Sequence, residues 1–89
     1  RKMKNLIKFI ITSIINNPKK FSLKEEITES GFTNYIISVD PEDMGRVIGK
    51  RGQIIRAIRI LVRTKALKEE KKVILTLNEE VSSKNSNPK

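Results

Sequence analysis

Two glycines enclose two adjacent cations in the segment Gly49-Lys50-Arg51-Gly52. Glycine permits sharp turns of the backbone and lets a ligand approach the main chain closely. Lysine and arginine attract phosphate groups, and the segment that follows has the pattern of a helix, whose first N–H groups also favour anions. The residue types and their spacing therefore predict a loop that holds the phosphate backbone of a nucleic acid.

A nucleotide-binding P-loop is an alternative for a loop that contains glycine and lysine. That motif needs four residues between its first two glycines, whereas Gly45 and Gly49 are separated by three. Arg51 also follows Lys50 where a P-loop has the hydroxyl that binds Mg²⁺. The glycines could instead only cap the flanking helices, but capping would leave the two cations unexplained. The residues fit a nucleic-acid loop better than either alternative.

Three arginines continue the positive charge beyond the loop. Arg56, Arg59 and Arg63 recur at helical spacing in the segment after Gly52 and form a stripe beside its apolar face. The apolar face comprises Ile54, Ile55, Ile58, Leu61 and Val62. Taken alone, Arg63 is better explained as a solvated basic residue. Together with Arg46 and the loop, the stripe predicts a surface that binds polyanions.

The composition agrees with a polyanionic partner. The 89 residues include 19 Lys and Arg against 10 Asp and Glu, which gives a net charge of +9. Such an excess predicts affinity for polyanions, with a generally solvated basic surface as the alternative. The chain has no Cys and no His, so disulfides, thiolate metal sites and Cys/His catalysis are excluded. We expect no metal and no cofactor.

The acidic segment Asp40-Pro41-Glu42-Asp43 must be weighed as a catalytic carboxylate pair. It fits the start of a helix better, because Asp40 can cap the first N–H groups and Pro41 suits the first helical position. Glu42 and Asp43 would then lie at the positive end of the helix dipole. We therefore predict no enzymatic activity.

Hydrophobic periodicity predicts the elements that position the loop. Helices are expected at residues 3–16, 41–48 and 53–67, and strands at residues 21–29, 34–39 and 72–77. The first two strands should pair as a hairpin around Ser30-Gly31. The predicted fold class is α+β, in the order helix–strand–strand–helix–helix–strand, with a three-stranded sheet packed against three helices.

The same periodicity predicts which side chains are buried. One face of the first helix collects Met3, Leu6, Ile7, Ile10, Ile11 and Ile14. The inward residues of the first strand are Phe21, Leu23 and Ile27, and those of the last strand are Val73, Leu75 and Leu77. Residues 1–79 are expected to form one domain with a core of about residues 3–77, and residues 80–89 a flexible tail, because their apolar content is too low to fold.

The basic start and the apolar run from Leu6 to Ile15 require a test for a signal peptide or membrane anchor. Lys8 interrupts the run, and Asn16-Asn17-Pro18-Lys19-Lys20 follows it in place of a cleavage site. The run is also too short to span a bilayer. We expect a cytoplasmic protein with no membrane association.

The loop and its flanks resemble a KH domain. Val47-Ile48-Gly49-Lys50-Arg51-Gly52, followed by Ile54 and by Ala57-Ile58-Arg59, is similar to the core of that family, and the helix-first order is similar to its type II arrangement. Residues 41–50 and 57–62 are further similar to the KhpA-like family of small bacterial KH-domain RNA-binding proteins. The resemblance covers about residues 4–77.

The resemblance implies a groove that holds about four nucleotides of single-stranded RNA. Gly49 and Gly52 would let the RNA backbone lie against the loop, and Lys50 and Arg51 would face its phosphates. Val47, Ile48 and Ile55 would form an apolar floor for the bases. The full set of expected RNA-binding residues is Arg46, Val47, Ile48, Gly49, Lys50, Arg51, Gly52, Ile55, Arg56 and Arg59.

Weak sequence specificity is expected of this groove. Aromatic residues make up 4% of the chain and none lies near the loop in sequence, so strong base stacking is not predicted. Phosphate contacts position a strand without reading it, and they make binding sensitive to salt. Because no residue is an evident reader of the 2′-hydroxyl group, single-stranded DNA stays an alternative ligand.

A second surface is expected on the third helix. At about 100° per residue, Ile60 and Leu67 lie outside the main apolar arc, beside Ala57 and Thr64. Scattered exposed apolar residues are the alternative explanation. The resemblance implies a homodimer, or a heterodimer with a larger KH-containing RNA-binding protein. We assign this interface to Ala57, Ile60, Leu61 and Thr64.

The resemblance thus points to an RNA chaperone or post-transcriptional regulator that acts with a protein partner. The alternative is a protein-interaction adaptor that works through the third helix.

Overall fold

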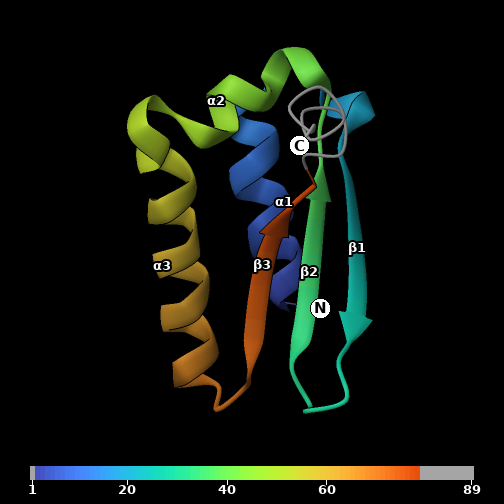
Figure 1. Cartoon of the computed structure of the whole chain (residues 1–89), viewed down its shortest axis with the longest axis vertical. Coiled ribbons are helices and arrows are strands. Elements are labelled where there is room, and N and C mark those ends of the chain that lie inside the picture. Colours follow the sequence, from blue (N-terminus) through green and yellow to red (C-terminus); the bar gives the residue numbers. More distant parts are fainter. Residues whose placement is uncertain (1, 79–89) are drawn as a thin grey trace, which may run out of the picture.

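The computed structural model describes residues 2–78 and shows the expected α+β order (Figure 1). Its elements are α1 (Lys2–Ile14), η1 (Pro18–Lys20), β1 (Ser22–Ile27), β2 (Thr33–Ser38), η2 (Pro41–Asp43), α2 (Met44–Ile48), η3 (Lys50–Gly52), α3 (Gln53–Lys68) and β3 (Val73–Leu77), where η marks a short 3₁₀ turn. The predicted tail at residues 80–89 lies outside the described residues.

The three strands form one mixed sheet in the order β1-β2-β3. β1 and β2 form the expected antiparallel hairpin, in which Leu23 lies opposite Ile37. β3 runs parallel to β2, and Tyr35 lies opposite Leu75. Parallel neighbours need a long connection, which here consists of α2, the glycine loop and α3. The loop therefore lies inside the crossover between β2 and β3.

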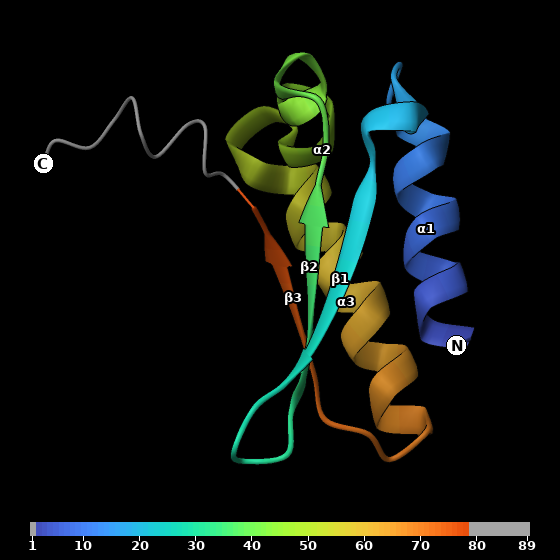
Figure 2. The same cartoon turned by 90° about the vertical axis from the view of Figure 1, so that its right-hand side faces the viewer.

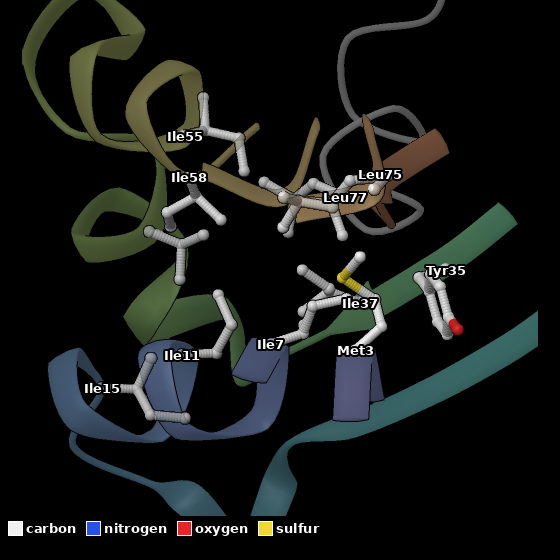
Figure 3. Close-up of a cluster of buried hydrophobic side chains, with 13 residues drawn as sticks. Met3, Ile7, Ile11, Ile15, Tyr35, Ile37, Ile55, Ile58, Leu75 and Leu77 are labelled. Atoms are coloured by element: carbon white, nitrogen blue, oxygen red, sulfur yellow. The ribbon is translucent and has the colours of Figure 1, made fainter. Parts of the chain in front are cut away.

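One hydrophobic core fills the space between the sheet and the helices. Side chains from α1, β2, α3 and β3 point toward one another there (Figure 3). The buried apolar residues are Met3, Ile7, Ile11, Ile15, Tyr35, Ile37, Val47, Ile55, Ile58, Val62, Ala66, Leu75 and Leu77. The opposite face of the sheet is largely polar apart from Ile36 and Ile74, and Thr76 Oγ1 donates a hydrogen bond there to Asn34 Oδ1 at 2.8 Å. The sheet is thus amphipathic, as expected of a sheet that is covered on one face.

Three of the predicted core positions are wrong, and the first is Ile54, which is 39% exposed at the start of α3. Ile27 is 74% exposed, because it ends β1 where the hairpin continues past the N-terminal end of α1 (Figure 2). Leu61 is 54% exposed. It lies about 100° around the helix from its buried neighbour Val62, outside the arc that faces the core. The buried arc of α3 is therefore narrower than the apolar pattern predicts.

The apolar run near the start of the chain forms α1, which has 13 residues. Its side chains Ile7 and Ile11 are completely buried against the rest of the domain. Across residues 2–78, no helix combines the length and hydropathy that a membrane span requires.

Candidate nucleic-acid interface

A buried aspartate fixes the helical segment that leads to the loop. Asp43 is 1% exposed, and its carboxylate oxygens accept hydrogen bonds from the backbone N–H groups of Asn16 and Asn17, each at 2.9 Å. Asp40 caps the turn η2, as expected. We expected Asp43 to act only as a charge at a helix start, but the structure shows that it also bonds the segment after α1 to the start of α2.

The glycine loop has an unusual backbone. Gly49, Arg51 and Gly52 have φ angles of 76°, 55° and 72°, which favour glycine and cost other residues roughly 1–2 kcal/mol each. Gly49 also lacks room for a side chain, because a Cβ atom there would lie 2.6 Å from Cγ1 of Ile54. The backbone thus explains both glycines of the motif. It also holds Arg51 in a conformation that is common at ligand-binding loops.

The tip of the loop concentrates positive charge at the N-terminus of α3. The side chains of Lys50 and Arg51 are exposed, and Arg56 Nη2 donates a hydrogen bond to the carbonyl oxygen of Arg51 at 3.2 Å. Within residues 2–78, none of these three cations forms an ion pair. α3 begins at Gln53 without a side-chain cap, so its first N–H groups and its dipole add to the attraction for anions.

A groove lies between α3 and the edge strand β3, and Arg59 is the α3 residue of its lining that is nearest to the loop in sequence. Its volume is about 480 Å³, with Arg59 and Arg63 on the α3 side and Ile74 and Thr76 on the β3 side. Arg59 Nε donates a hydrogen bond to the carbonyl oxygen of Leu75 at 3.3 Å. Its guanidinium group is thereby held at the strand edge, with its charge unpaired by any acid of residues 2–78.

A comparison with protein families matches residues 4–77 to the family described as KhpA/KhpB, KH domain. The chain belongs to this family. A protein of Clostridium perfringens named RNA-binding protein KhpA is 40% identical over 75 residues, which cover 84% of this chain and 99% of the relative. Proteins with the same name from Caldanaerobacter subterraneus and Listeria monocytogenes are 44% and 42% identical over 77 residues; they cover 84% and 86% of this chain and 99% and 100% of the relatives. No solved structure gives a significant match.

In this KH domain, most of the expected RNA-binding residues lie on one surface. The loop, Arg56 and Arg59 follow one another from the end of α2 along α3. Arg46 lies one turn before the loop, with its Nε 3.4 Å from the Asp43 carboxylate. The expectation for Val47 is wrong: its side chain is 0% exposed, so it supports the loop from inside the core and cannot touch a base.

The apolar floor of the KH domain is therefore smaller than expected. Ile55 is also buried in the core, whereas Ile48 is only partly buried. The groove walls add residues that the sequence did not indicate, namely Phe32, Ile74 and Thr76. No local pattern could have found them, because they reach the groove only through the pairing of β2 with β3.

The outer side of α3 carries an apolar strip on the surface of the KH domain. Ala57, Ile60, Leu61 and Thr64 are all exposed, and Ile60 retains 55% of its accessible surface. Leu67, about two helical turns after Ile60, is exposed as well. This apolar strip lies beside the arginines Arg56, Arg59 and Arg63 on the helix surface. α3 therefore presents an apolar face to the core, an arginine face to the groove and the apolar strip to solvent.

Proposed function

We propose that this protein binds single-stranded RNA through its Gly-Lys-Arg-Gly loop and the groove between α3 and β3, and that it has no catalytic role. The observation that carries the proposal is the loop itself. Two exposed cations stand between glycines of positive φ, directly before the N-terminus of a 16-residue helix. Membership of the KhpA/KhpB family supports RNA as the ligand, since the similar proteins are named RNA-binding proteins.

The RNA strand would lie with its backbone against the loop and then follow α3. Gly49 leaves room for the Ile54 side chain, which packs against the loop, and Lys50 and Arg51 would reach toward a phosphate from the tip. Farther along, Arg56, Arg59 and Arg63 recur at one-turn intervals. The helix rises roughly 16 Å from the loop to the last of these arginines, which gives the strand a positive wall along its course.

Such a surface binds the backbone of a strand but contributes little to the recognition of its base sequence. Contacts to phosphate carry no sequence information, and the ordered cations make binding depend steeply on salt. This property suits an RNA chaperone or post-transcriptional regulator that acts in the cytoplasm on many RNAs. Comparison of RNA with DNA of the same sequence would test whether 2′-hydroxyl groups contribute to binding.

A double charge reversal tests the loop. The variant Lys50→Asp/Arg51→Asp should bind single-stranded RNA roughly 100-fold more weakly by fluorescence anisotropy, because two phosphate contacts become repulsive. The chain provides a matched control in Lys19→Asp/Lys20→Asp, which reverses two adjacent exposed cations in the 3₁₀ turn η1. We expect the control to lose less than about threefold, because that turn is not part of the groove.

Circular dichroism must show that both variants of this pair keep the fold. Equal losses of affinity in the two variants would mean that RNA responds only to net charge, and the proposed site would then be wrong.

The exposed strip on α3 favours a second proposal, that this protein associates with itself or with a larger KH-containing RNA-binding protein. Ala57 and Thr64 are small and lie around the more prominent Ile60 and Leu61, so another surface could approach α3 closely. Association would also place two RNA grooves in one assembly, and linked weak sites bind a common strand more tightly than either alone.

An aspartate on the strip tests the association. Ile60→Asp should shift the mass measured by light scattering toward the monomer across a concentration series, because burial of an unpaired carboxylate is costly. Phe9→Asp is the matched control, since Phe9 is an exposed apolar residue of α1. An unchanged mass for Ile60→Asp, or an equal shift for both variants, would refute this interface.

A further inference from the structure

The far end of the groove contains an aromatic residue. Phe32 precedes β2, and Lys72 precedes β3. The two strands start side by side, with Thr33 opposite Val73 and the Thr33 N–H donating to the carbonyl oxygen of Lys72 at 2.9 Å. The residues before the strands are therefore neighbours, and Lys72 Nζ lies 5.8 Å from the centre of the Phe32 ring.

The groove does not end at the last arginine of α3. A second hollow of about 240 Å³ adjoins it and shares Phe32, Arg63 and Val73 with it. This hollow adds Leu67 and Lys71 to the lining. The two hollows are therefore neighbours with Phe32 in the lining of both, and the second lies at the turn between α3 and β3.

The turn gathers cations around the ring. Glu70 has a positive φ of 58°, and the Lys71 N–H donates to the carbonyl oxygen of Ala66 at 2.8 Å, which fixes the turn before β3. The nearby acid Glu69 is bound by Lys65 at 3.0 Å, and this hydrogen bond lowers the pKa of the Glu69 carboxyl group.

Three cations at this end of the described chain are not neutralised by an ion pair, although, besides Lys65, the charge of Lys71 contributes to the lowered pKa of the Glu69 carboxyl group. In the described part of the chain, Arg63, Lys71 and Lys72 form no ion pair. An aromatic ring flanked by unpaired cations is the arrangement that single-stranded nucleic acids use, with the base stacked on the ring and the phosphates near the cations.

We infer that Phe32, Arg63, Lys71 and Lys72 form a second nucleotide subsite, which takes an unpaired base of an RNA strand that already lies on the loop. The base displaces Lys72 from the ring, and the ammonium group moves to a flanking phosphate. Binding at this subsite rests on the proposed function, because the strand must first follow the loop and α3. The protein would then bind strands longer than the roughly four nucleotides that a KH loop holds.

Two RNA lengths test the subsite. Phe32→Leu keeps an apolar side chain and removes the stacking surface. We expect it to bind an RNA of about eight nucleotides roughly tenfold more weakly and an RNA of about four nucleotides as well as the unmodified protein, since stacking on an aromatic side chain contributes that much per base. Phe9→Leu, on the exposed side of α1, should leave both affinities unchanged.

Nuclear magnetic resonance supplies a direct readout. The chain has three phenylalanines, so the ring signals of Phe32 can be assigned and should show contacts to base protons of the longer RNA only. Unchanged affinity of Phe32→Leu for the longer RNA would overturn the subsite, as would equal losses for both lengths.

The loop variant separates this inference from the proposed function. If Lys50→Asp/Arg51→Asp no longer binds either RNA while Phe32→Leu binds both RNAs normally, the subsite alone is refuted. Normal binding of both RNAs by the loop variant would refute the proposed function and the subsite with it.

Discussion

The turns η1 and η3 each present two adjacent cations at the same end of the molecule, one beside β1 and the other before α3 (Figure 1). In η1 the cations Lys19 and Lys20 follow a proline and precede a strand. In η3 the cations Lys50 and Arg51 lie between glycines and precede a helix. The turn η3 lies between glycines of positive φ and leads into a 16-residue helix, whereas η1 begins with a proline, which has no N–H group to donate to an anion. A pair of charges attracts an anion, but the backbone around the pair decides whether a site exists.

The surroundings of the two turns support the same distinction. The hollow between α1 and β1 has a volume of about 700 Å³ and is larger than the groove beside α3. One of its lysines, Lys4, is paired with Glu25 at 3.4 Å. The arginines Arg56 and Arg59 instead bond to backbone carbonyl oxygens, which hold their guanidinium groups in place without neutralising them. Part of the positive charge beside the larger hollow is therefore neutralised, whereas that of the two arginines beside the proposed RNA groove is not.

The largest expected effect concerns the residue that links the two turns. Asp43 bonds the backbone just before η1 to the segment that leads to η3, so Asp43→Ala would leave two N–H groups without a partner. We expect a loss of roughly 3 kcal/mol in the free energy of unfolding, measured with urea. Glu42→Ala, at an exposed neighbour, should change stability by less than about 0.5 kcal/mol. A similar stability for both variants would show that the link is unimportant.

A smaller effect should follow from a methyl group in the loop. Gly49→Ala introduces a Cβ atom 2.6 Å from Ile54 at a φ of 76°, and we expect a loss of roughly 2 kcal/mol in stability, together with weaker RNA binding. Gly45→Ala is the control, because a Cβ atom at that position would lie in open space. In α2 it should stabilise the protein by about 0.5–1 kcal/mol. Thermal and urea unfolding of both variants would decide whether the loop backbone is as constrained as its geometry indicates.

The smallest effect is a change in salt dependence. Lys50→Gln/Arg51→Gln should reduce the slope of log affinity against log salt concentration by about 1.4, since each phosphate contact to a single strand contributes about 0.7. Lys19→Gln/Lys20→Gln should leave the slope unchanged. Equal reductions of the slope in the two variants would mean that the two turns do not differ and that RNA binding responds only to the net charge of the protein.

Features that depend on neighbours in sequence were predictable. The order of elements, the Asp40 cap and the alternation in β3 follow from local spacing, and the structure confirms them. Features that depend on distant partners were not. The bonds of Asp43 involve backbone groups in the segment after α1, and the burial of Val47 depends on how the helices close over the core. Phe32 enters the groove only because β2 and β3 start together, so no sequence pattern near the loop contains it.

The parallel pairing of β2 and β3 also has a consequence for the order of folding. α1 and the β1–β2 hairpin are made of segments adjacent in the chain, whereas Thr33 can meet Val73 only after the whole crossover has closed. Contacts between distant segments form more slowly, because the chain between them must first lose its freedom. We therefore expect β3 to add last during synthesis. Because β3 forms one wall of the groove, a nascent or truncated chain would have the cationic loop sequence before it has a complete surface on which to hold RNA.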